Sequence, residues 1–425
     1  MSVIDEFYVF GDKNVTVPVH LNFGKYVLDR LRKMEERVAL VNATTGEELT
    51  IRQLLQYSVN LATSLTKLGI GKGDVIAIGT EKRNAFMPTV LGALLSGATC
   101  TPYDVDSGKA VFRHKLSVAK PTRVICSKLF WERYEEVLNS CGSIKSYFSL
   151  DGFPQNAVSV QSLVAEDIDI ERFEPARVVG QVDTAWILYS SGTTGLPKGV
   201  RLTHLNCIMS SLPDKLPKLQ NILQGYGMTE CGEPTSEIWA DEGPRAGSIG
   251  KATPGIIIKI VDLKTNIKLG PNQTGEIRLS GPMLMKGYID IDPSTYLDEE
   301  DFFKTGDVGY YDDDKYFYIV DRIKDIINFE GHKIAPLQLE NLLQMHQKVL
   351  EAAVIGKPDP VSGELPLAFV VLKPGSDVTE QELVDYIAAE VPQFMQLAGG
   401  VKFIDKLPRS PRGKILRRQL REMLN

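Results

Sequence analysis

Apolar and polar residues alternate along the first third of the chain in a way that predicts helices and strands in turn. Residues 50–68 carry apolar side chains three and four positions apart, which predicts an amphipathic helix with Thr50 as its N-cap. Short apolar runs at 75–78 and 123–126 predict buried strands, and a second helix pattern lies between them at 85–97. Strands that alternate with helices predict a parallel sheet covered by helices.

From about residue 247 to residue 322 the pattern changes. Short runs rich in β-branched and aromatic residues are separated by Gly, Pro, Asn and Asp, at 256–261, 275–279 and 316–320. This pattern is typical of antiparallel strands joined by turns, so a β-rich region is expected here.

The rest of the chain predicts a compact α+β unit. Helix and strand patterns follow one another at 336–346, 351–355, 367–372 and 379–391. The last helix opens with a capping box, formed by Thr379 and Glu382. We therefore predict an α/β protein with a large N-terminal domain, 1–322, and a small C-terminal domain, 323–425.

Composition and charge exclude several functional classes. A chain of 425 residues favours two or three domains, and 43% hydrophobic with 24% charged residues is ordinary for a soluble protein. The net charge of −6 gives no electrostatic basis for nucleic acid or an anionic membrane as the main partner. Its five cysteines show no CxxC pairing and its five histidines are scattered, so disulfides and zinc are not expected.

The sequence shows none of three common targeting signals. The acidic N-terminus does not fit a secretory signal, and no apolar run is long enough to cross a membrane. The chain ends in Met423, Leu424 and Asn425, which is not a peroxisomal tripeptide of the Ser-Lys-Leu type. A cytoplasmic location is expected, with the peroxisome as the alternative by another route.

A glycine-rich segment after an apolar run at 185–188 is the sharpest chemical signal. It runs through Ser190, Ser191, Gly192, Thr193, Thr194, Gly195, Leu196, Pro197, Lys198 and Gly199. Glycines allow the backbone to turn its N–H groups towards one point, and the hydroxyls and Lys198 add further donors. This predicts a cradle for phosphate oxygens. It is not a Walker A loop, which ends in Gly-Lys-Ser/Thr.

Further segments follow in order. They are Gly225-Tyr226-Gly227-Met228-Thr229-Glu230, Lys304-Thr305-Gly306-Asp307, Asp321-Arg322-Ile323-Lys324-Asp325 and Pro408-Arg409-Ser410-Pro411-Arg412-Gly413-Lys414. Together with the glycine-rich segment, these resemble the ordered motifs of the adenylate-forming (AMP-binding) enzymes, closest in pattern to insect luciferases and acyl-CoA ligases such as 4-coumarate–CoA ligase. Each motif has a plainer interpretation when taken alone, such as a turn before a helix cap for 225–230. The resemblance covers nearly the whole chain, and it implies the adenylate-forming enzyme fold with a C-terminal lid domain.

The resemblance also implies roles for single residues. Tyr226 would lie near adenine and Thr229 near the α-phosphate, while Glu230 would be a catalytic residue and the ligand of Mg²⁺. Asp307 would accept hydrogen bonds from the ribose hydroxyls, which suits a fixed carboxylate. Arg322 would contact ribose or phosphate.

The C-terminal part carries the remaining implied roles. Lys324 would be the hinge position and Lys414 the catalytic lysine. His332 is interpreted as a partly exposed loop residue rather than a base. A solvated helix face is expected for the arginines that follow Lys414, namely Arg417, Arg418 and Arg421.

The implied reaction activates a fatty or aromatic carboxylic acid with ATP to an acyl-adenylate, and then transfers the acyl group to coenzyme A. ATP, Mg²⁺, coenzyme A and a small carboxylic acid are therefore the expected ligands. One spacing departs from the family, because only 32 positions separate Lys198 from Glu230. Roughly a hundred residues of an α/β lobe are missing near 210–216, comparable to a small domain.

The missing block leaves alternative functions open. It would include the acyl pocket, so we expect impaired substrate binding and turnover. One alternative is a non-catalytic nucleotide- or acyl-binding derivative of the family, which the short 199–225 stretch favours and Lys414 disfavours. A luciferase-type monooxygenase is a further alternative, and an amino-acid-activating domain ranks below it because no carrier domain follows.

Overall fold

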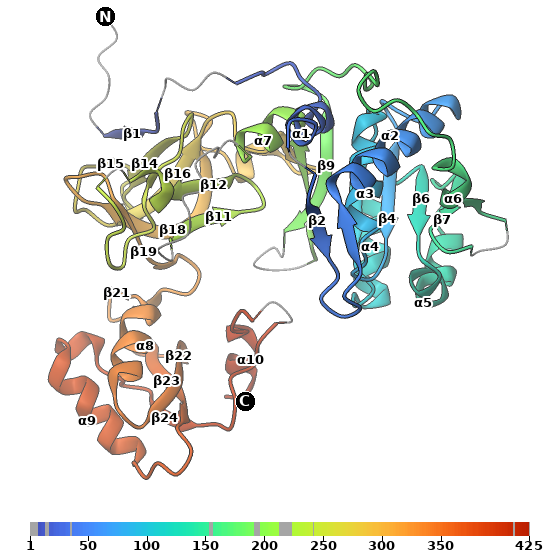
Figure 1. Ribbon diagram of the computed structural model, residues 1–425. Coiled ribbons are helices and arrows are strands. Elements are labelled where there is room, and N and C mark those ends of the chain that lie inside the picture. The colour runs from blue at the N-terminus through green and yellow to red at the C-terminus, as the bar shows by residue number, and fades with distance from the viewer. Residues whose placement is uncertain are drawn as a thin grey trace, which may run out of the picture.

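The computed structural model of the chain describes residues 7–12, 17–34, 36–152, 156–190, 196–211, 223–240, 242–410 and 413–424. Three regions follow one another along the chain (Figure 1). A large helix-covered sheet comes first and a β-rich region follows it, while the C-terminal unit lies on the far side of the β-rich region from strand β1.

The large sheet has eight strands within the described residues, in the order β17-β10-β9-β5-β4-β6-β7-β8. Neighbours from β5 to β8 run parallel, as the alternation of strands and helices predicts. Strand β9 joins parallel to β5, whereas β10 and β17 add antiparallel strands at one edge. The strand bounds are β4 Val75–Gly79, β5 Thr99–Tyr103, β6 Arg123–Cys126, β7 Ser146–Ser149, β8 Val158–Ser159, β9 Thr184–Ser190, β10 Lys198–Thr203 and β17 Gly287–Tyr288.

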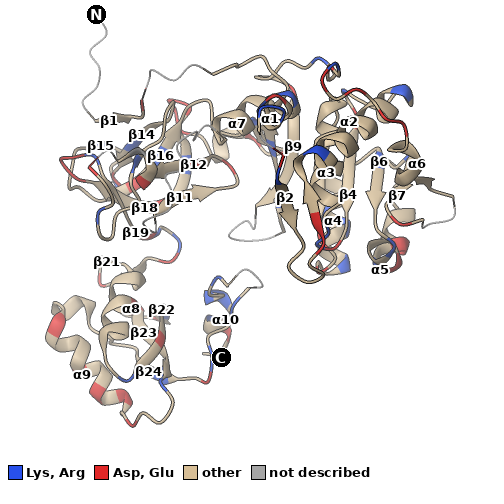
Figure 2. Ribbon diagram, in the orientation of Figure 1, with Lys and Arg blue, Asp and Glu red and all other residues tan. Residues whose placement is uncertain are grey.

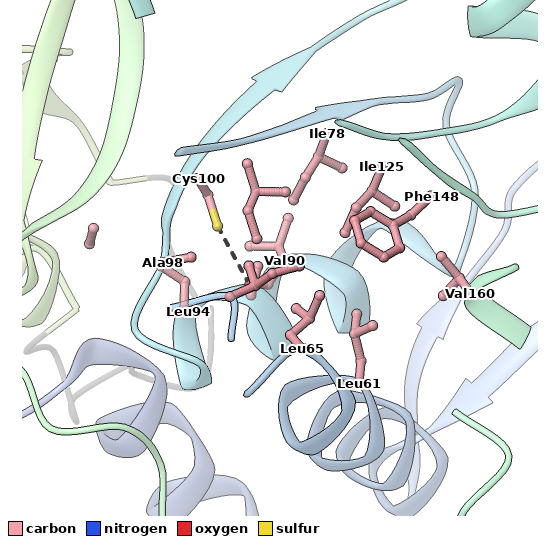
Figure 3. Packing of buried hydrophobic residues seen from close by; sticks show 14 of the residues in the cluster. Leu61, Leu65, Ile78, Val90, Leu94, Ala98, Cys100, Ile125, Phe148 and Val160 are labelled. Atoms are coloured by element: carbon pink, nitrogen blue, oxygen red, sulfur yellow. Dashed lines mark hydrogen bonds between the residues drawn. The ribbon is translucent and has the colours of Figure 1, made fainter. Parts of the chain in front are cut away.

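Helices cover both faces of this sheet. One face packs against Leu61 and Leu65 of α2 and against Val90 and Leu94 of α3, with Cys100 Sγ 3.8 Å from the Val90 carbonyl oxygen (Figure 3). Helices α4 and α5 cover the other face with a cluster of buried aromatic residues. The helix bounds here are α1 Phe23–Leu31, α2 Ile51–Lys67, α3 Phe86–Leu95, α4 Lys109–Ala119, α5 Lys128–Asn139, α6 Val160–Leu163 and α7 His204–Met209.

Helix α2 has the N-cap and the buried apolar face that its sequence pattern predicts. The Thr50 hydroxyl accepts the Gln53 N–H and the Gln53 side chain accepts the Thr50 N–H, which closes a capping box. The apolar positions Leu61 and Leu65 are fully buried, one turn apart on the same face. The predicted helix over 50–68 and its N-cap are confirmed.

The β-rich region contains two antiparallel sheets among the described residues, and it extends beyond the expected range 247–322, because β1, β11 and β12 lie before residue 247. The larger follows the order β1-β14-β16-β18-β19, with β15 paired to β14, and the smaller follows β11-β12-β13. Strand β1 comes from the N-terminus, which sequence reasoning did not place here. Their bounds are β1 Tyr8–Phe10, β11 Gly225–Met228, β12 Gly232–Ser236, β13 Lys251–Ala252, β14 Ile257–Val261, β15 Lys268–Leu269, β16 Gly275–Ser280, β18 Phe303–Tyr311 and β19 Phe317–Arg322.

Shorter elements complete the N-terminal part. A separate hairpin joins β2, Val38–Val41, to β3, Glu48–Thr50, just before α2. Two 3₁₀ turns lie in the β-rich region, at Glu237–Trp239 and Pro293–Thr295.

The C-terminal unit is an α+β sandwich built on a five-stranded sheet within the described residues. Helices α8 and α9 pack on one face, whereas Leu420 of α10 packs on the other. Alternate residues of β22 face these two layers, since Ala352 belongs to the first cluster and Ala353 to the second. The bounds are β20 Ile327–Phe329, β21 His332–Ile334, α8 Pro336–Met345, β22 Val349–Asp359, β23 Gly363–Leu372, α9 Glu380–Glu390, the 3₁₀ turn Gln393–Met395, β24 Gly400–Phe403 and α10 Arg417–Glu422.

The expected solvated face of the last helix is wrong at Arg417. Its Nη2 atom lies 2.6 Å from Oε1 of the buried Glu340 on α8, whereas Arg418 is 90% exposed. The Glu340 partner lies 77 positions earlier in the chain, so helical spacing alone did not reveal the pair.

Basic and acidic residues are interspersed along all three regions (Figure 2). Within the described part of the chain, no helix has the length and apolar character that crossing a membrane requires. The division of the chain at 322/323 stays a prediction, although β19 ends at Arg322 and β20 begins at Ile327.

Candidate active site

Asp307 lies at the centre of one group of predicted site residues. Its Oδ2 atom accepts a hydrogen bond of 2.6 Å from the Tyr226 hydroxyl, and its Oδ1 atom lies 2.8 Å from Nε of Arg322. The Asp307 side chain is 4% exposed. We call Tyr226, Asp307 and Arg322 the Asp307 cluster. Three motifs far apart in the sequence meet here, because Tyr226 lies on β11, Asp307 on β18 and Arg322 at the end of β19.

The hydrogen bonds in this cluster have a defined direction. Burial, together with the negative charge of Asp307, raises the pKa of the Tyr226 hydroxyl well above its usual range. Tyr226 therefore stays protonated and donates to Asp307. A carboxylate has about four lone-pair positions, so Asp307 retains the capacity to accept hydrogen bonds from a neighbouring diol.

Glu230 forms a second group with Tyr288 and Lys198, which we call the Glu230 cluster. Its Oε1 atom accepts a hydrogen bond of 2.7 Å from the Tyr288 hydroxyl, and its side chain is buried. The Lys198 ammonium lies 5.0 Å from the centre of the Tyr288 ring. Burial and then the Glu230 carboxylate raise the pKa of Tyr288, against a smaller opposite effect from Ser190. Lys198 and Glu230, both singled out from sequence, thus lie against the same tyrosine, Lys198 at its ring and Glu230 at its hydroxyl.

Sequence reasoning did not assign a role to Tyr288. It lies on β17, which pairs with β10, so its position depends on a strand pairing that spans 88 positions of the chain between Val200 and Tyr288. The stretch 281–288, Gly-Pro-Met-Leu-Met-Lys-Gly-Tyr, also resembles insect luciferase-type sequence, but this resemblance did not single out the tyrosine. Arg201 was also missed, and its buried Nε atom has no hydrogen-bond partner among the described residues.

The two clusters are adjacent. Cys231 follows Glu230 in the chain. Burial, and then the negative charges of Glu230 and Asp307, raise the pKa of its thiol. Met228 packs against the apolar cores on both sides, that of the β-rich sheet and that around Val200. Residues 225–228 form a strand, so the alternative of a turn before a helix cap is wrong for this motif.

The glycine-rich segment joins β9 to β10. Five predicted residues, Ser191, Gly192, Thr193, Thr194 and Gly195, lie outside the described residues. The flanking Ser190 and Lys198 are direct partners across the β9–β10 pair. Lys198 is followed by Gly199, where an added Cβ would lie 2.7 Å from Val118 of α4, so close packing excludes a side chain.

Helix α4 holds both ends of this segment. The Tyr189 hydroxyl donates to the Lys115 carbonyl oxygen at 2.9 Å. A His114 ring nitrogen lies 2.9 Å from the Pro197 carbonyl oxygen. These two bonds fix where the segment leaves the sheet and where it returns.

The remaining predicted residues are not all brought together. Thr229 lies in the turn after β11, beside Glu230. Lys324 follows β19, where partial desolvation lowers the pKa of its ammonium. His332 is exposed on β21 and stacks on Phe394, with 4.3 Å between ring centres.

Lys414 lies on the C-terminal unit, apart from both clusters. It is exposed in a turn before α10, where the Ser410 hydroxyl accepts its N–H at 3.2 Å. In Figure 1 this end of the chain lies beside the C-terminal sheet, while β11 and β18 lie in the upper part of the molecule.

The site suits a hard divalent cation only in part. Among the described residues, no three His, Cys, Asp or Glu side chains cluster as a metal site. One oxygen of Glu230 is engaged by Tyr288, and the carboxylate is buried. A single carboxylate of this kind fits a cation such as Mg²⁺ that takes its other ligands from phosphate and water.

Comparisons with known proteins give matches over most of the chain. The model of the AMP-binding enzyme family matches residues 28–214 and 208–289, and that of the AMP-binding enzyme C-terminal domain matches 338–414. Luciferin 4-monooxygenase of Nipponoluciola cruciata is 30% identical over 516 residues, covering 93% of this chain and 94% of that protein. The 4-coumarate–CoA ligase 3 of Arabidopsis thaliana is 28% identical, covering 97% of this chain and 93% of that protein.

Solved structures show the same fold. ATP-bound MatB from Rhodopseudomonas palustris superimposes with a TM-score of 0.81 at 22% identity, covering 95% of this chain and 99% of that chain. An anthranilate–CoA ligase in complex with anthranoyl-AMP gives a TM-score of 0.80 at 19% identity, covering 96% of this chain and 98% of that chain. The expected fold class is confirmed.

The comparisons also expose a gap. An alignment of 516 positions with a chain of 425 residues leaves at least 91 positions of the relative opposite gaps in this chain. The family model matches in two segments that meet at residues 208–214, within the stretch where the sequence spacing indicated a missing block.

Proposed function

Because the chain belongs to the AMP-binding enzyme family, we propose that it activates a carboxylic acid with ATP and transfers the acyl group to coenzyme A. The observation that carries this proposal is the Asp307 cluster, which joins a buried carboxylate to a tyrosine and an arginine. By family the chain is an AMP-forming CoA ligase. We propose a fatty or aromatic acid as the substrate, in keeping with the 4-coumarate–CoA ligase and acyl-CoA synthetase relatives.

The proposed first half-reaction is an in-line displacement at phosphorus. A carboxylate oxygen of the acid attacks the α-phosphorus of ATP, and the bond from that phosphorus to the bridging oxygen breaks, releasing pyrophosphate. The carboxylate is already ionised at neutral pH, so this step needs no general base. It needs positive charge and fixed donors around two anions that repel each other.

The predicted site residues would each bind a different part of ATP. Asp307 would accept hydrogen bonds from the ribose hydroxyls, with Tyr226 beside the adenine and Arg322 beside ribose or phosphate. The donors of the segment Ser190–Gly195 and the charge of Lys198 would bind the phosphates. Thr229 would donate to the α-phosphate, next to Glu230.

Glu230 is the residue that would hold Mg²⁺. When bound there, the ion would neutralise phosphate charge and draw electron density from the phosphate oxygens. The hydrogen bond from Tyr288 fixes the Glu230 carboxylate in one orientation. Lys198, whose ammonium lies 5.0 Å from the centre of the Tyr288 ring, would contribute a second positive charge.

In the second half-reaction the sulfur of coenzyme A attacks the acyl carbonyl carbon, its proton passes to solvent, and AMP leaves with the electron pair of the acyl–oxygen bond. We propose that the C-terminal domain, 323–425, turns about Lys324 between the two halves. Lys414 would contact the carboxylate and α-phosphate in one orientation and be withdrawn in the other. Its exposure in a turn supports a role that depends on such movement.

The gap near residues 208–214 supports a second candidate, a nucleotide- or acyl-binding protein with weak or no turnover. The block that relatives carry and this chain lacks would supply much of the acyl pocket. A nucleotide-binding derivative would also bind ATP through the Asp307 cluster, and it would differ from the enzyme in not depending on Lys414.

Pyrophosphate release from purified protein, with ATP, Mg²⁺ and a panel of fatty and aromatic acids, tests the proposal. We expect acid-dependent release that is slow, and that falls roughly a hundredfold in Lys414→Ala, as when one donor to a developing charge is removed. Lys406→Ala is the matched control, because Lys406 is exposed on the same unit, and it should retain wild-type release. Equal release by both variants would reject the role of Lys414. Absent release with intact ATP binding would favour the binding protein.

A further inference from the structure

The backbone around Asp307 departs from regular pairing. Across the β16–β18 pair, Glu276 lies opposite Val308 and Arg278 lies opposite Lys304. Ile277 therefore faces three residues, 305–307, instead of one. Gly306 adopts a φ of +71°, a left-handed conformation that favours glycine. This bulge turns the Asp307 carboxylate towards Tyr226 and Arg322.

Hydrogen bonds from two neighbouring strands hold the bulge, and on the β19 side the Gly306 carbonyl oxygen accepts the Ile323 N–H at 2.9 Å. The Thr305 hydroxyl donates to the Ile277 carbonyl oxygen at 2.6 Å and accepts the Asp307 N–H at 3.0 Å. The Gly306 N–H donates to Oε1 of Glu276 at 3.2 Å. Glu276 supplies the one side chain from the facing strand in this set.

Glu276 is itself fixed by buried charges. Its Oε2 atom accepts from Nε of Arg278 at 2.9 Å, Arg278 Nη1 lies 3.1 Å from Asp298, and Asp298 lies 2.9 Å from Lys259. The side chains of all four are at most 11% exposed. Burying four charges costs desolvation energy that apolar residues would avoid, so the network is better explained by orientation than by stability.

We propose that Glu276 is a positioning residue, which holds the bulge at Gly306 so that Asp307 meets the ribose hydroxyls of the nucleotide. This rests on the proposed ATP-dependent function. Without the Glu276 oxygen, the Gly306 N–H loses its partner, and this glycine is then held through its carbonyl oxygen, which accepts the Ile323 N–H at 2.9 Å. The Asp307 carboxylate would then be less fixed in orientation, while it stays charged and buried.

The test compares ATP with 2′,3′-dideoxy-ATP, which lacks both ribose hydroxyls, by calorimetric titration. The wild type should prefer ATP at least about tenfold, as expected for hydrogen bonds to a charged group. Glu276→Asp keeps the charge beside Arg278 but draws the oxygen back from Gly306 by one methylene. It should lose most of that preference, and Glu276→Ala should behave alike.

Asp298→Asn is the matched control, because it weakens the same buried network two residues farther from the bulge, beyond Arg278. If Glu276 only stabilises the fold, Glu276→Asp and Asp298→Asn should keep the same preference for ATP. Equal preference in both would overturn the proposal. Loss confined to the Glu276 variants would support it.

A second measurement needs no ligand. Amide hydrogen exchange in β18, Phe303–Tyr311, should be faster in Glu276→Asp than in Asp298→Asn. If the wild type does not bind ATP, the proposed function fails, and this exchange still decides whether Glu276 holds the bulge. Unchanged exchange in Glu276→Asp would overturn the proposal.

Discussion

Single residues of this molecule take their chemistry from what surrounds them. Asp307 gains a fixed orientation from Tyr226 and Arg322, and Glu230 gains one from Tyr288. Burial also determines protonation, most clearly at His204. This histidine is fully buried at the start of α7, and its Nδ1 atom accepts the Phe23 N–H at 3.0 Å. Desolvation lowers its pKa to about 4, against an opposing effect of Asp183.

His204 therefore predicts a pH dependence of stability. Between its folded pKa of about 4 and its ordinary value of about 6.5, the unfolded chain binds more protons than the folded protein. Stability should be fully retained above pH 6.5 and fall as the pH is lowered, by about 2 kcal/mol between pH 6.5 and pH 5.

Urea unfolding followed by tryptophan fluorescence at both pH values measures this fall. His204→Gln should show a smaller fall than the wild type, because glutamine does not titrate. His332→Gln is the control, since His332 is exposed on β21. Identical falls in the wild type and His204→Gln would show that His204 does not carry the effect.

Among the helices and strands, the sequence predicted those whose signals lie within a few residues of chain. Helix α2 and helix α9 were correctly placed because their capping boxes lie within four residues of chain. The antiparallel edge formed by β10 and β17 was not predicted, because these strands come together across a long separation in sequence. Tyr288 was missed as a site residue for the same reason.

The ion pair between Arg417 and Glu340 is expected to stabilise the C-terminal unit. Removing this charge leaves Glu340 buried, with the Val354 N–H, at 2.8 Å, as the one remaining hydrogen-bond partner of Oε1 in the described part of the chain. Arg417→Met should destabilise the unit by about 3 kcal/mol, as when one partner of a buried pair is removed. The loss should shrink at low pH, because burial already raises the pKa of Glu340 and it can then take a proton.

Hydrogen exchange in β22, Val349–Asp359, would detect this loss as faster opening. Arg418→Met is the matched control, because Arg418 is 90% exposed and, among the residues that the structure describes, pairs only with Glu422 in the next turn. Such a surface pair contributes little. If both variants exchange alike, the Arg417–Glu340 pair is not what holds α10 to the sheet.

For the whole molecule, the sequence predicted the family, the α/β fold and the order of the motifs. It also indicated the missing block, through the short spacing from Lys198 to Glu230. It did not predict that Asp307 and Glu230 form adjacent clusters, since that depends on how β11 packs between two sheets. Motif residues on one element were predictable, whereas contacts between distant elements required the structure.

We propose that this chain binds a nucleotide through Asp307 although it lacks a block that its relatives carry. Calorimetric titration of the purified protein with ATP and Mg²⁺ measures this binding, with Asp307→Asn as the comparison. We expect saturable one-site binding by the wild type. Asp307→Asn should bind at least about tenfold more weakly, because a charged acceptor is lost. Absence of wild-type binding, or equal affinity in the two proteins, would contradict the account.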